Sequence, residues 1–334
     1  MSDNYTIRYL AEDEYENWDR FVEQHPEGTL FHTTSFLHSM SEPIGRRLMV
    51  AGIFQQSNLI GGFAFTVVKK LGIKLIAVPY DCPVYHPLFT NRDTKYISKQ
   101  ESYNKKLVNI LLLFLKNSYC GFELKFSFFK TDFRPYKQTG LEIDLSYTYL
   151  LDLSNFNEKN VPFDPAVKRQ IKKAAKNNYT LSMGLEKENV NSFYSLLSQT
   201  YKRQGLALKL SEENYESLFK QLYAKGWFEL YVLKFNDIPA SAMGIVNFNG
   251  VAYYWLSASN PEVYNLGGTS ALIAEVLSNL KRKEVKHFDF VGANTESIAR
   301  FKAGFNFELT PVYNIKYESR VVKQLFKIKK LLKR

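Results

Sequence analysis

Lys302 is the residue whose setting most clearly suggests chemistry. It stands between Phe301 and Phe305 in the string Phe-Lys-Ala-Gly-Phe. A desolvated ammonium stabilises a developing oxyanion more strongly than an ammonium in water does. Acyl transfer through a tetrahedral intermediate is therefore a reaction that this lysine could support. The alternative is a lysine whose stem passes two core rings to reach solvent.

The surrounding segment, Val285–Tyr317, predicts the elements that must position this lysine. A short buried strand ends in Asp289, and Gly292 indicates a turn. A helix is expected from about Thr295, followed by a last strand from about Phe307. Lys302 is thus expected near the end of a helix that follows a buried strand.

Two further stretches could attract anions. Asn265-Leu266-Gly267-Gly268-Thr269-Ser270 precedes a predicted helix, where free amide groups and the helix dipole favour phosphate. Gly-Gly before a helix is, however, often only a turn. The predicted helix Pro165–Asn177, with Asp164 as cap and Pro165 in the first turn, has a predicted buried stripe of Val167, Ile171 and Ala174 or Ala175. It carries five cations and no acid, which are Lys168, Arg169, Lys172, Lys173 and Lys176. This density of charge suits a diphosphate, a nucleotide or RNA, although a solvated face is equally compatible.

Motifs for other kinds of catalysis are absent from the sequence. There is no nucleophile elbow, Walker loop, dinucleotide-binding glycine pattern or pair of histidines at metal spacing. The five histidines are scattered, and His287 lies on an apolar strand where a core histidine is the simpler interpretation. Cys82 and Cys120 have no partner at metal spacing, so no metal site is expected and a reducing compartment is the simplest inference.

The charge of the chain is concentrated at its end. Of the net charge of +11, seven units come from the cations between Arg320 and Arg334, where no acid occurs. Apolar residues recur among them at helical spacing, which predicts a basic amphipathic helix over 319–334. Anionic lipid and RNA are both candidate partners of this helix. The alternative is a terminal helix whose apolar stripe packs on its own domain.

The sequence favours a cytoplasmic protein, with contact at the inner face of the membrane left open. Its first residues lack the basic head and apolar run of a signal peptide. The longest apolar helical stretch, Leu107–Leu115, is far shorter than the roughly 20 residues needed to span a bilayer.

Both halves of the chain predict the same order of elements: strand, two helices, three antiparallel strands, helix, strand, strand. The main elements expected in the first half are strands at 6–10, 48–54, 59–68, 74–78, 122–128 and 142–153 and helices at 12–24, 29–40 and 102–116, with an irregular loop over 79–91. Those expected in the second half are strands at 179–183, 228–235, 240–248, 251–257 and 287–291 and helices at 165–176, 190–203, 212–224 and 270–283. At 334 residues, two mixed α/β domains are expected, at 1–155 and 160–318, divided near the polar stretch 154–163.

Four strings in the second half resemble a known family when they are taken in order. They are Tyr253–Ser259, Leu266–Gly268, Phe288–Gly292 and Phe301–Phe305. Upstream, Val167–Ala174, Thr200–Gly205 and Leu30–Phe36 are similar to the basic helix, the arginine-ended helix and the opening segment of the same family. The family is the FemAB-like branch of the GNAT acyltransferase superfamily, and the resemblance spans nearly the whole chain.

The resemblance implies two tandem GNAT-like domains and attack of an amine on a thioester or an aminoacyl ester. It implies that Lys302 stabilises the oxyanion or the donor, and that Tyr254 and Asp289 line the catalytic cleft. Asp289 could act as a base only if burial raises its pKa. The implied substrate-binding residues are Arg203, Tyr253, Trp255, Phe301, Arg169, Lys172 and Lys173. The implied donor-phosphate residues are Asn265, Gly267, Gly268 and Ser270.

The sequence also departs from the family pattern. Users of acyl-CoA usually show Arg or Gln before a Gly-x-Gly/Ala loop, whereas this chain has Asn265-Leu266-Gly267-Gly268. No heptads predict the coiled-coil arm of many cell-wall enzymes, and the lysine expected shortly after Phe36 is missing. A related branch acylates amino sugars of surface polysaccharides and fits the chain equally well.

The function expected from the sequence is transfer of an acyl or aminoacyl group to an amine of an amino sugar, a sugar nucleotide, a lipid-linked sugar or a cell-wall precursor. Acyl-CoA or aminoacyl-tRNA would serve as co-substrate, with no tightly bound cofactor and no DNA partner. The alternative is a non-catalytic double-GNAT module that binds an anionic polymer, tRNA or a membrane surface. An RNA-binding scaffold is disfavoured because no RNA-binding fold is indicated.

Overall fold

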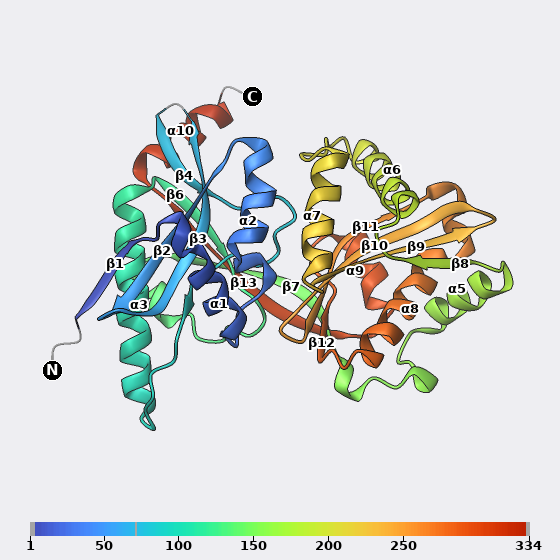
Figure 1. Cartoon of the computed structure of the whole chain (residues 1–334), viewed down its shortest axis with the longest axis horizontal. Coiled ribbons are helices and arrows are strands. Elements are labelled where there is room, and N and C mark those ends of the chain that lie inside the picture. Colours follow the sequence, from blue (N-terminus) through green and yellow to red (C-terminus); the bar gives the residue numbers. More distant parts are fainter. Residues whose placement is uncertain (1–3, 71, 332–334) are drawn as a thin grey trace. The chain divides into compact units, whose positions relative to one another are not determined.

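The chain forms two compact units, which are described separately. The computed structural model describes residues 4–70 and 72–331, except for the side chains of 326–331 (Figure 1). Unit 1 comprises Met1–Leu145 and Val312–Arg334, and unit 2 comprises Ser146–Pro311. These limits differ from the predicted 1–155 and 160–318 because two strands, β7 and β13, each run from one unit into the other. The chain therefore leaves unit 1 within a strand and before the irregular stretch 154–163.

Unit 1 contains an antiparallel sheet in the order β1-β2-β3-β4, with β5 also paired to β3. Its strands are β1 (Tyr5–Tyr9), β2 (Arg47–Gln55), β3 (Asn58–Lys70), β4 (Ile73–Ala77) and β5 (Leu88–Phe89). Unit 1 also contains β6 (Gly121–Lys125), which pairs with β13 in the other sheet. The predicted hairpin between β2 and β3 is confirmed, with Gln55 opposite Asn58. The prediction of an entirely irregular loop over 79–91 was wrong, because β5 pairs there with Gly61 and Gly62.

Helices surround this sheet in the predicted order. They are α1 (Tyr15–Gln24), α2 (Thr34–Ser41), α3 (Ile97–Ser118), α4 (Arg134–Lys137) and α10 (Arg320–Leu331), with 3-10 turns at Glu12–Glu14, Leu30–His32 and Glu42–Ile44. Thr33 caps α2, since its hydroxyl accepts a hydrogen bond from the Phe36 amide at 3.2 Å. The predicted helix after Ser319 is confirmed over Arg320–Leu331. Its last three residues and the side chains after Leu325 lie outside the described part.

Unit 2 contains most of an eight-stranded mixed sheet, which runs in the order β6-β13-β7-β12-β11-β10-β9-β8. Its strands are β7 (Glu142–Asp152), β8 (Thr180–Met183), β9 (Phe228–Phe235), β10 (Ile238–Phe248), β11 (Val251–Ser259), β12 (His287–Asp289) and β13 (Glu308–Glu318), the first and last of these being shared with unit 1. Its helices are α5 (Pro165–Lys176), α6 (Lys187–Arg203), α7 (Glu212–Ala224), α8 (Gly268–Arg282) and α9 (Glu296–Ala303), with 3-10 turns at Leu153–Asn155, Glu158–Asn160 and Pro261–Leu266. The predicted mixed α/β class and the repeated order of elements are confirmed.

One parallel pairing in this sheet creates the position of the candidate site. β11 lies parallel to β12, with Val251 opposite His287 and Tyr253 opposite Asp289. The pairing ends at Asp289, where β12 stops, although β11 continues to Ser259. Between Gly244 and Ile245 the register of β10 against β11 shifts, which gives β11 one extra residue there.

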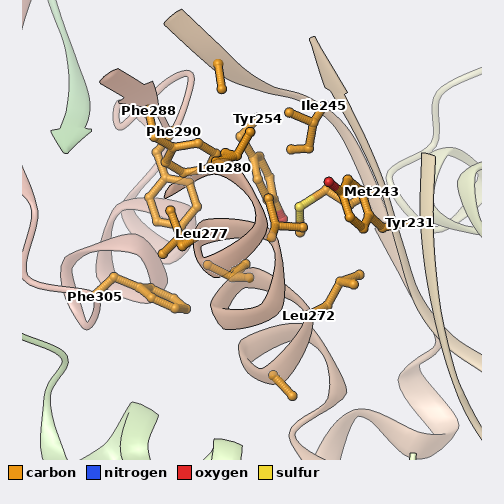
Figure 2. Close-up of a cluster of buried hydrophobic side chains, with 14 of the residues drawn as sticks. Tyr231, Met243, Ile245, Tyr254, Leu272, Leu277, Leu280, Phe288, Phe290 and Phe305 are labelled. Carbon is orange, nitrogen blue, oxygen red and sulfur yellow. The ribbon is translucent and has the colours of Figure 1, made fainter. Parts of the chain in front are cut away.

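The core of unit 2 on the α8 side is apolar and aromatic (Figure 2). Leu272, Leu277 and Leu280 of α8 face side chains of the sheet, and Phe305 closes the cluster beyond α9. The sheet contributes Tyr231, Met243, Ile245, Tyr254, Phe288 and Phe290. Burying each such side chain stabilises the fold by about 1.5–3 kcal/mol, which fixes α8 and the end of β12 against each other.

Candidate functional site

Lys302 lies in the last turn of α9 with its ammonium inside unit 2. Only 5% of the residue is exposed. Its Nζ donates hydrogen bonds to the carbonyl oxygens of Phe290 at 2.5 Å, Val291 at 2.6 Å and Gly292 at 3.0 Å. Burial lowers the pKa of Lys302 to about 8, and the nearby Asp289 carboxylate acts in the opposite direction. The alternative of a lysine that reaches past the core to solvent does not fit this geometry.

The aromatic rings near the ammonium are different from those predicted. Lys302 Nζ lies 5.3 Å from the ring centre of Tyr254 and 5.4 Å from that of Phe290. Phe301 and Phe305, its neighbours in the sequence, pack edge to face on each other at 5.5 Å. The prediction that these two rings hold the lysine was wrong, because the lysine side chain extends away from them toward the end of β12.

Asp289 is the last residue of β12 and is also buried. Its Oδ1 accepts hydrogen bonds from the Thr148 hydroxyl and from the Val291 amide, the latter at 2.8 Å. Burial raises the pKa of Asp289, and the two hydrogen bonds and the Lys302 charge oppose this shift. The burial that the sequence required for a basic Asp289 is therefore present. Thr148 was not anticipated, because only the pairing of β7 with β12 brings it here.

Tyr254 lies beside the Lys302 ammonium, whereas its two neighbours on β11 lie on the other face of the sheet. Burial raises the pKa of Tyr254 to about 12, and its ring packs edge to face on Phe290 at 5.1 Å. Side chains alternate along a strand, so Tyr253 points to the face opposite Tyr254, where it stands beside its register partner Asp289. Burial, and then the Asp289 carboxylate, raise the pKa of Tyr253. On the same face as Tyr253, Trp255 contacts Phe219 of α7. The structure thus divides the three predicted aromatic site residues between two faces of the sheet.

Helix α5 presents the predicted cations to solvent. Val167 and Ala174 are buried, which confirms the predicted apolar stripe. Lys168, Arg169, Lys172, Lys173 and Lys176 are all exposed. None of them forms an ion pair with any residue that the structure describes. Asp164 occupies the predicted cap position, but its side chain makes no capping hydrogen bond.

The start of α8 is packed against α5. Gly267 has a left-handed backbone, with φ of 81°, and a Cβ there would lie 2.3 Å from the carbonyl oxygen of Gln170. The side-chain Oε1 of Gln170 is 2.9 Å from the same point. Gly268 and Ser270 are buried, whereas Asn265 is exposed. Close helix packing thus gives a physical reason for glycine at 267, and the role of this loop in binding donor phosphate stays a prediction.

Arg203 ends α6 with an exposed guanidinium. Its Nη2 donates to the Ser259 carbonyl oxygen at 3.1 Å and to the Thr200 hydroxyl at 3.0 Å. These bonds hold the guanidinium beside the end of β11 and leave further N–H groups for a ligand.

A cavity of about 380 Å³ in unit 1 was not anticipated from the sequence. It is lined by Glu12, Tyr15, Thr34, Ser35, His38, Glu42, Arg46, Arg47 and Leu48. Arg46 donates to the Val78 carbonyl oxygen at 2.9 Å and stacks over Tyr80 at 4.9 Å. The two adjacent arginines after Gly45 were the signal in the sequence for the cations of this lining.

Two kinds of feature are absent from the described residues. No group of three or more His, Cys, Asp or Glu side chains could hold a metal ion there. Within residues 4–70 and 72–331, no helix combines the length and the apolar character needed to cross a membrane.

Comparison with known proteins shows a family match over part of the sequence and a shared fold over nearly the whole chain. Residues 165–303 match the family described as "Acetyltransferase (GNAT) domain". A search of curated protein sequences found no match. Among solved structures, FemX is similar at 14% identity and a TM-score of 0.70, covering 97% of this chain and 99% of that chain.

Two further structures share the arrangement over almost the whole chain. L-PGS from Bacillus licheniformis has 13% identity and a TM-score of 0.59, with 96% of each chain covered. A tandem GNAT protein from the clavulanic acid biosynthesis pathway has 13% identity and a TM-score of 0.52, with 94% of this chain and 98% of that chain covered. Residues 165–303 therefore match a GNAT domain, and the chain as a whole shares the tandem fold of FemX and of the tandem GNAT protein.

Proposed function

We propose that this protein transfers an acyl or aminoacyl group to an amine of an amino sugar, a sugar nucleotide, a lipid-linked sugar or a cell-wall precursor. The observation that carries the proposal is the buried ammonium of Lys302 at the end of β12, inside the GNAT domain. Acyl-CoA and aminoacyl-tRNA are the two candidate donors, as co-substrates. The donor phosphates are assigned to the loop Asn265–Ser270 and to the cations of α5.

In the proposed reaction the acceptor nitrogen attacks the donor carbonyl carbon. The carbonyl oxygen becomes an oxyanion, which the positive charge of Lys302 stabilises. The carbon–sulfur or carbon–oxygen bond then breaks with its electron pair going to the leaving sulfur or oxygen. The amine loses one proton, and the leaving group takes up one proton to depart as the thiol or the ribose hydroxyl. Asp289 is the candidate acceptor for the amine proton, and Tyr254 lines the same region. Holding the two reactants together supplies much of the acceleration.

The acceptor is assigned to polar and aromatic groups of unit 2. Arg203 would bind acceptor phosphate through its remaining N–H groups, and Phe301, Tyr253 and Trp255 are the candidate ring contacts. In unit 1, the cavity that contains Arg46 and Arg47 is a separate candidate site for an anionic ligand. Bidentate hydrogen bonding makes arginine well suited to phosphate.

The test is turnover with defined donors. Purified protein would be incubated with acyl-CoA or aminoacyl-tRNA and candidate amines, with thiol release or loss of label from tRNA as the readout. Lys302→Met should reduce turnover at least about 100-fold, the cost of losing one oxyanion-stabilising group. Lys281→Met is the matched control, because Lys281 also donates to two carbonyl oxygens, those of Leu153 and Ser154, at 2.8 Å each. Normal turnover by Lys302→Met would remove the role given to this lysine.

A second candidate function is binding without catalysis. The five unpaired cations of α5 favour it, since they suit an anionic polymer such as tRNA. The basic helix α10 and the cations that follow it would add peripheral contact with the inner face of a membrane. Pull-down with tRNA and with anionic liposomes, using the full chain and a chain ending at Ser319, separates these partners. Unchanged liposome binding by the shorter chain would exclude the terminal helix.

A further inference from the structure

Val291 has a backbone conformation that β-branched residues rarely adopt. Its φ is +50°, and the next residue, Gly292, has φ of +76°. A left-handed backbone at a non-glycine residue is strained, and for a β-branched residue it is a clear outlier. Such residues persist only where surrounding interactions hold them, and they concentrate at functional sites. Val291 follows the candidate base Asp289 by two residues, which makes its conformation informative.

Hydrogen bonds to Asp289 and Lys302 and to the backbone of β7 hold the turn at residues 289–292. The Val291 amide donates to Asp289 Oδ1 at 2.8 Å, and its carbonyl oxygen accepts from Lys302 Nζ at 2.6 Å. The Phe290 and Ala293 amides donate to the carbonyl oxygens of Tyr149 and Tyr147 at 2.9 and 2.8 Å. The chain therefore doubles back at the end of β12, and the carbonyl oxygens of three successive residues converge on one ammonium.

This arrangement uses the whole donor capacity of Lys302. An ammonium has three N–H donors, and each is accounted for by one carbonyl oxygen of residues 290–292. A developing oxyanion can therefore receive an N–H from Lys302 only if one carbonyl is released. Releasing a buried carbonyl costs free energy. Relaxation of the strained Val291 backbone, when the turn opens, offsets part of that cost.

We propose that Val291 is a positioning residue for Lys302, whose strained backbone poises the 289–292 turn to release the ammonium toward the reacting carbonyl. The inference rests on the proposed acyl transfer for its role in turnover. In this proposal the backbone strain at Val291 has a function, because it favours opening of the 289–292 turn. A residue that adopts the left-handed conformation without cost would leave the turn closed on Lys302.

Substitutions at this one position distinguish strain from packing. Val291→Gly and Val291→Asn both accept a left-handed backbone, whereas Val291→Ile keeps the β-branch and the strain. We expect kcat to fall about tenfold in the glycine and asparagine variants, with KM within about twofold, because left-handed strain of this size is worth roughly one decade in rate. Val291→Ile should keep the wild-type kcat. Glu284→Gly is the matched control, since Glu284 has φ of +57° at the end of α8.

A second readout needs no substrate. The rate at which an amine-acylating reagent modifies Lys302 at pH 8 can be followed by peptide mass spectrometry in the folded protein. Modification should be about tenfold slower in Val291→Gly than in the wild type or Val291→Ile, while the rate at Lys281 stays constant as an internal reference. Equal modification rates in all variants, or an unchanged kcat in Val291→Gly, would overturn the proposal. Absence of turnover by the wild-type protein with every donor would instead refute the proposed function, and the modification rates would still decide the role of Val291.

Discussion

Two buried histidines make unit 1 sensitive to acid. His32 is 2% exposed and His86 is fully buried, and their rings lie 4.5 Å apart. His32 Nδ1 accepts from the Thr29 amide at 3.1 Å, which places the proton of the neutral ring on Nε2. His86 Nδ1 donates to the Pro87 carbonyl oxygen at 2.9 Å, so its Nε2 is the bare nitrogen. A further proton on either ring would bring charge into the core.

The lowered pKa values of His32 and His86 reflect the free-energy cost of burying that charge. Burial lowers the pKa of His86 to about 4, and the Glu27 carboxylate opposes the shift while Lys130 and His25 add to it. The pKa of His32 is lowered well below its usual value by burial and then by His86. In the unfolded chain a histidine has a pKa of about 6.5. The unfolded state therefore binds more protons below about pH 6.5, and the stability of the folded state falls as the pH falls toward 4.

The magnitude follows from the pKa of His86. With values of about 4 folded and about 6.5 unfolded, this residue alone lowers the free energy of unfolding by about 2 kcal/mol between pH 7 and pH 5, and by about 3 kcal/mol in all. His32 adds to the loss. Urea unfolding followed by far-ultraviolet circular dichroism at half-unit steps from pH 7.5 to 5 would measure it.

Two variants test whether His86 causes the loss of stability at low pH. In His86→Asn the amide can replace the Nδ1 donor but cannot titrate, so the dependence on pH should weaken by about 2 kcal/mol over the same range. His38→Asn is the control, because His38 is exposed at the surface of α2 and pairs only with Glu42. A wild-type free energy of unfolding that is constant from pH 7 to 5, or equal slopes for the wild type and His86→Asn, would refute the reasoning.

Three further predictions concern unit 2. Gly267→Ala should lower the free energy of unfolding by about 2 kcal/mol or more, measured by urea unfolding, because the new Cβ would lie 2.3 Å from the Gln170 carbonyl oxygen in a left-handed backbone. Thr148→Val should cost about 1.5–3 kcal/mol in the same assay, since the buried Asp289 carboxylate loses a hydroxyl donor, whereas Thr148→Ser should cost little. Because Lys302 is proposed to act in its charged form, kcat/KM should fall as the pH rises through about 8. An active Lys302→Arg variant should not show this fall, since arginine stays protonated.

Local patterns were sufficient to predict much of the architecture. The apolar positions Val167 and Ala174, with Pro165 at the first turn, correctly predicted helix α5 and its buried stripe. The apolar run before Asp289 and the glycine at 292 correctly predicted the strand and turn before α9. These features depend on residues close in sequence, where periodicity and turn chemistry carry the information.

The contacts of the site depend on pairings that local patterns do not contain. Thr148 reaches Asp289 only because β7 lies beside β12, although 141 positions separate the two residues. Lys302 faces Tyr254 and Phe290 because its side chain extends toward the turn, a direction that adjacency to Phe301 did not indicate. The left-handed Val291 has no signature in residue type, since valine disfavours that conformation. The order of β7 and β12 in the sheet and the strained backbone at Val291 therefore could not be predicted from local sequence patterns.

The contact between α5 and the start of α8 bears on the choice of donor. A helix N-terminus attracts anions because its amide groups are unpaired and its dipole is positive. Here the carbonyl oxygen and Oε1 of Gln170 lie against Gly267, so partial negative charge already faces that end of α8. A diphosphate at this position would have to share the space with the α5 backbone, whereas the cations of α5 remain exposed and unpaired among the described residues. Binding of CoA to the wild type and to a variant with Arg169, Lys172 and Lys173 changed to glutamate therefore separates the two elements. Affinity that depends on these cations but not on Gln170→Ala would assign the donor phosphates to α5 rather than to the α8 loop.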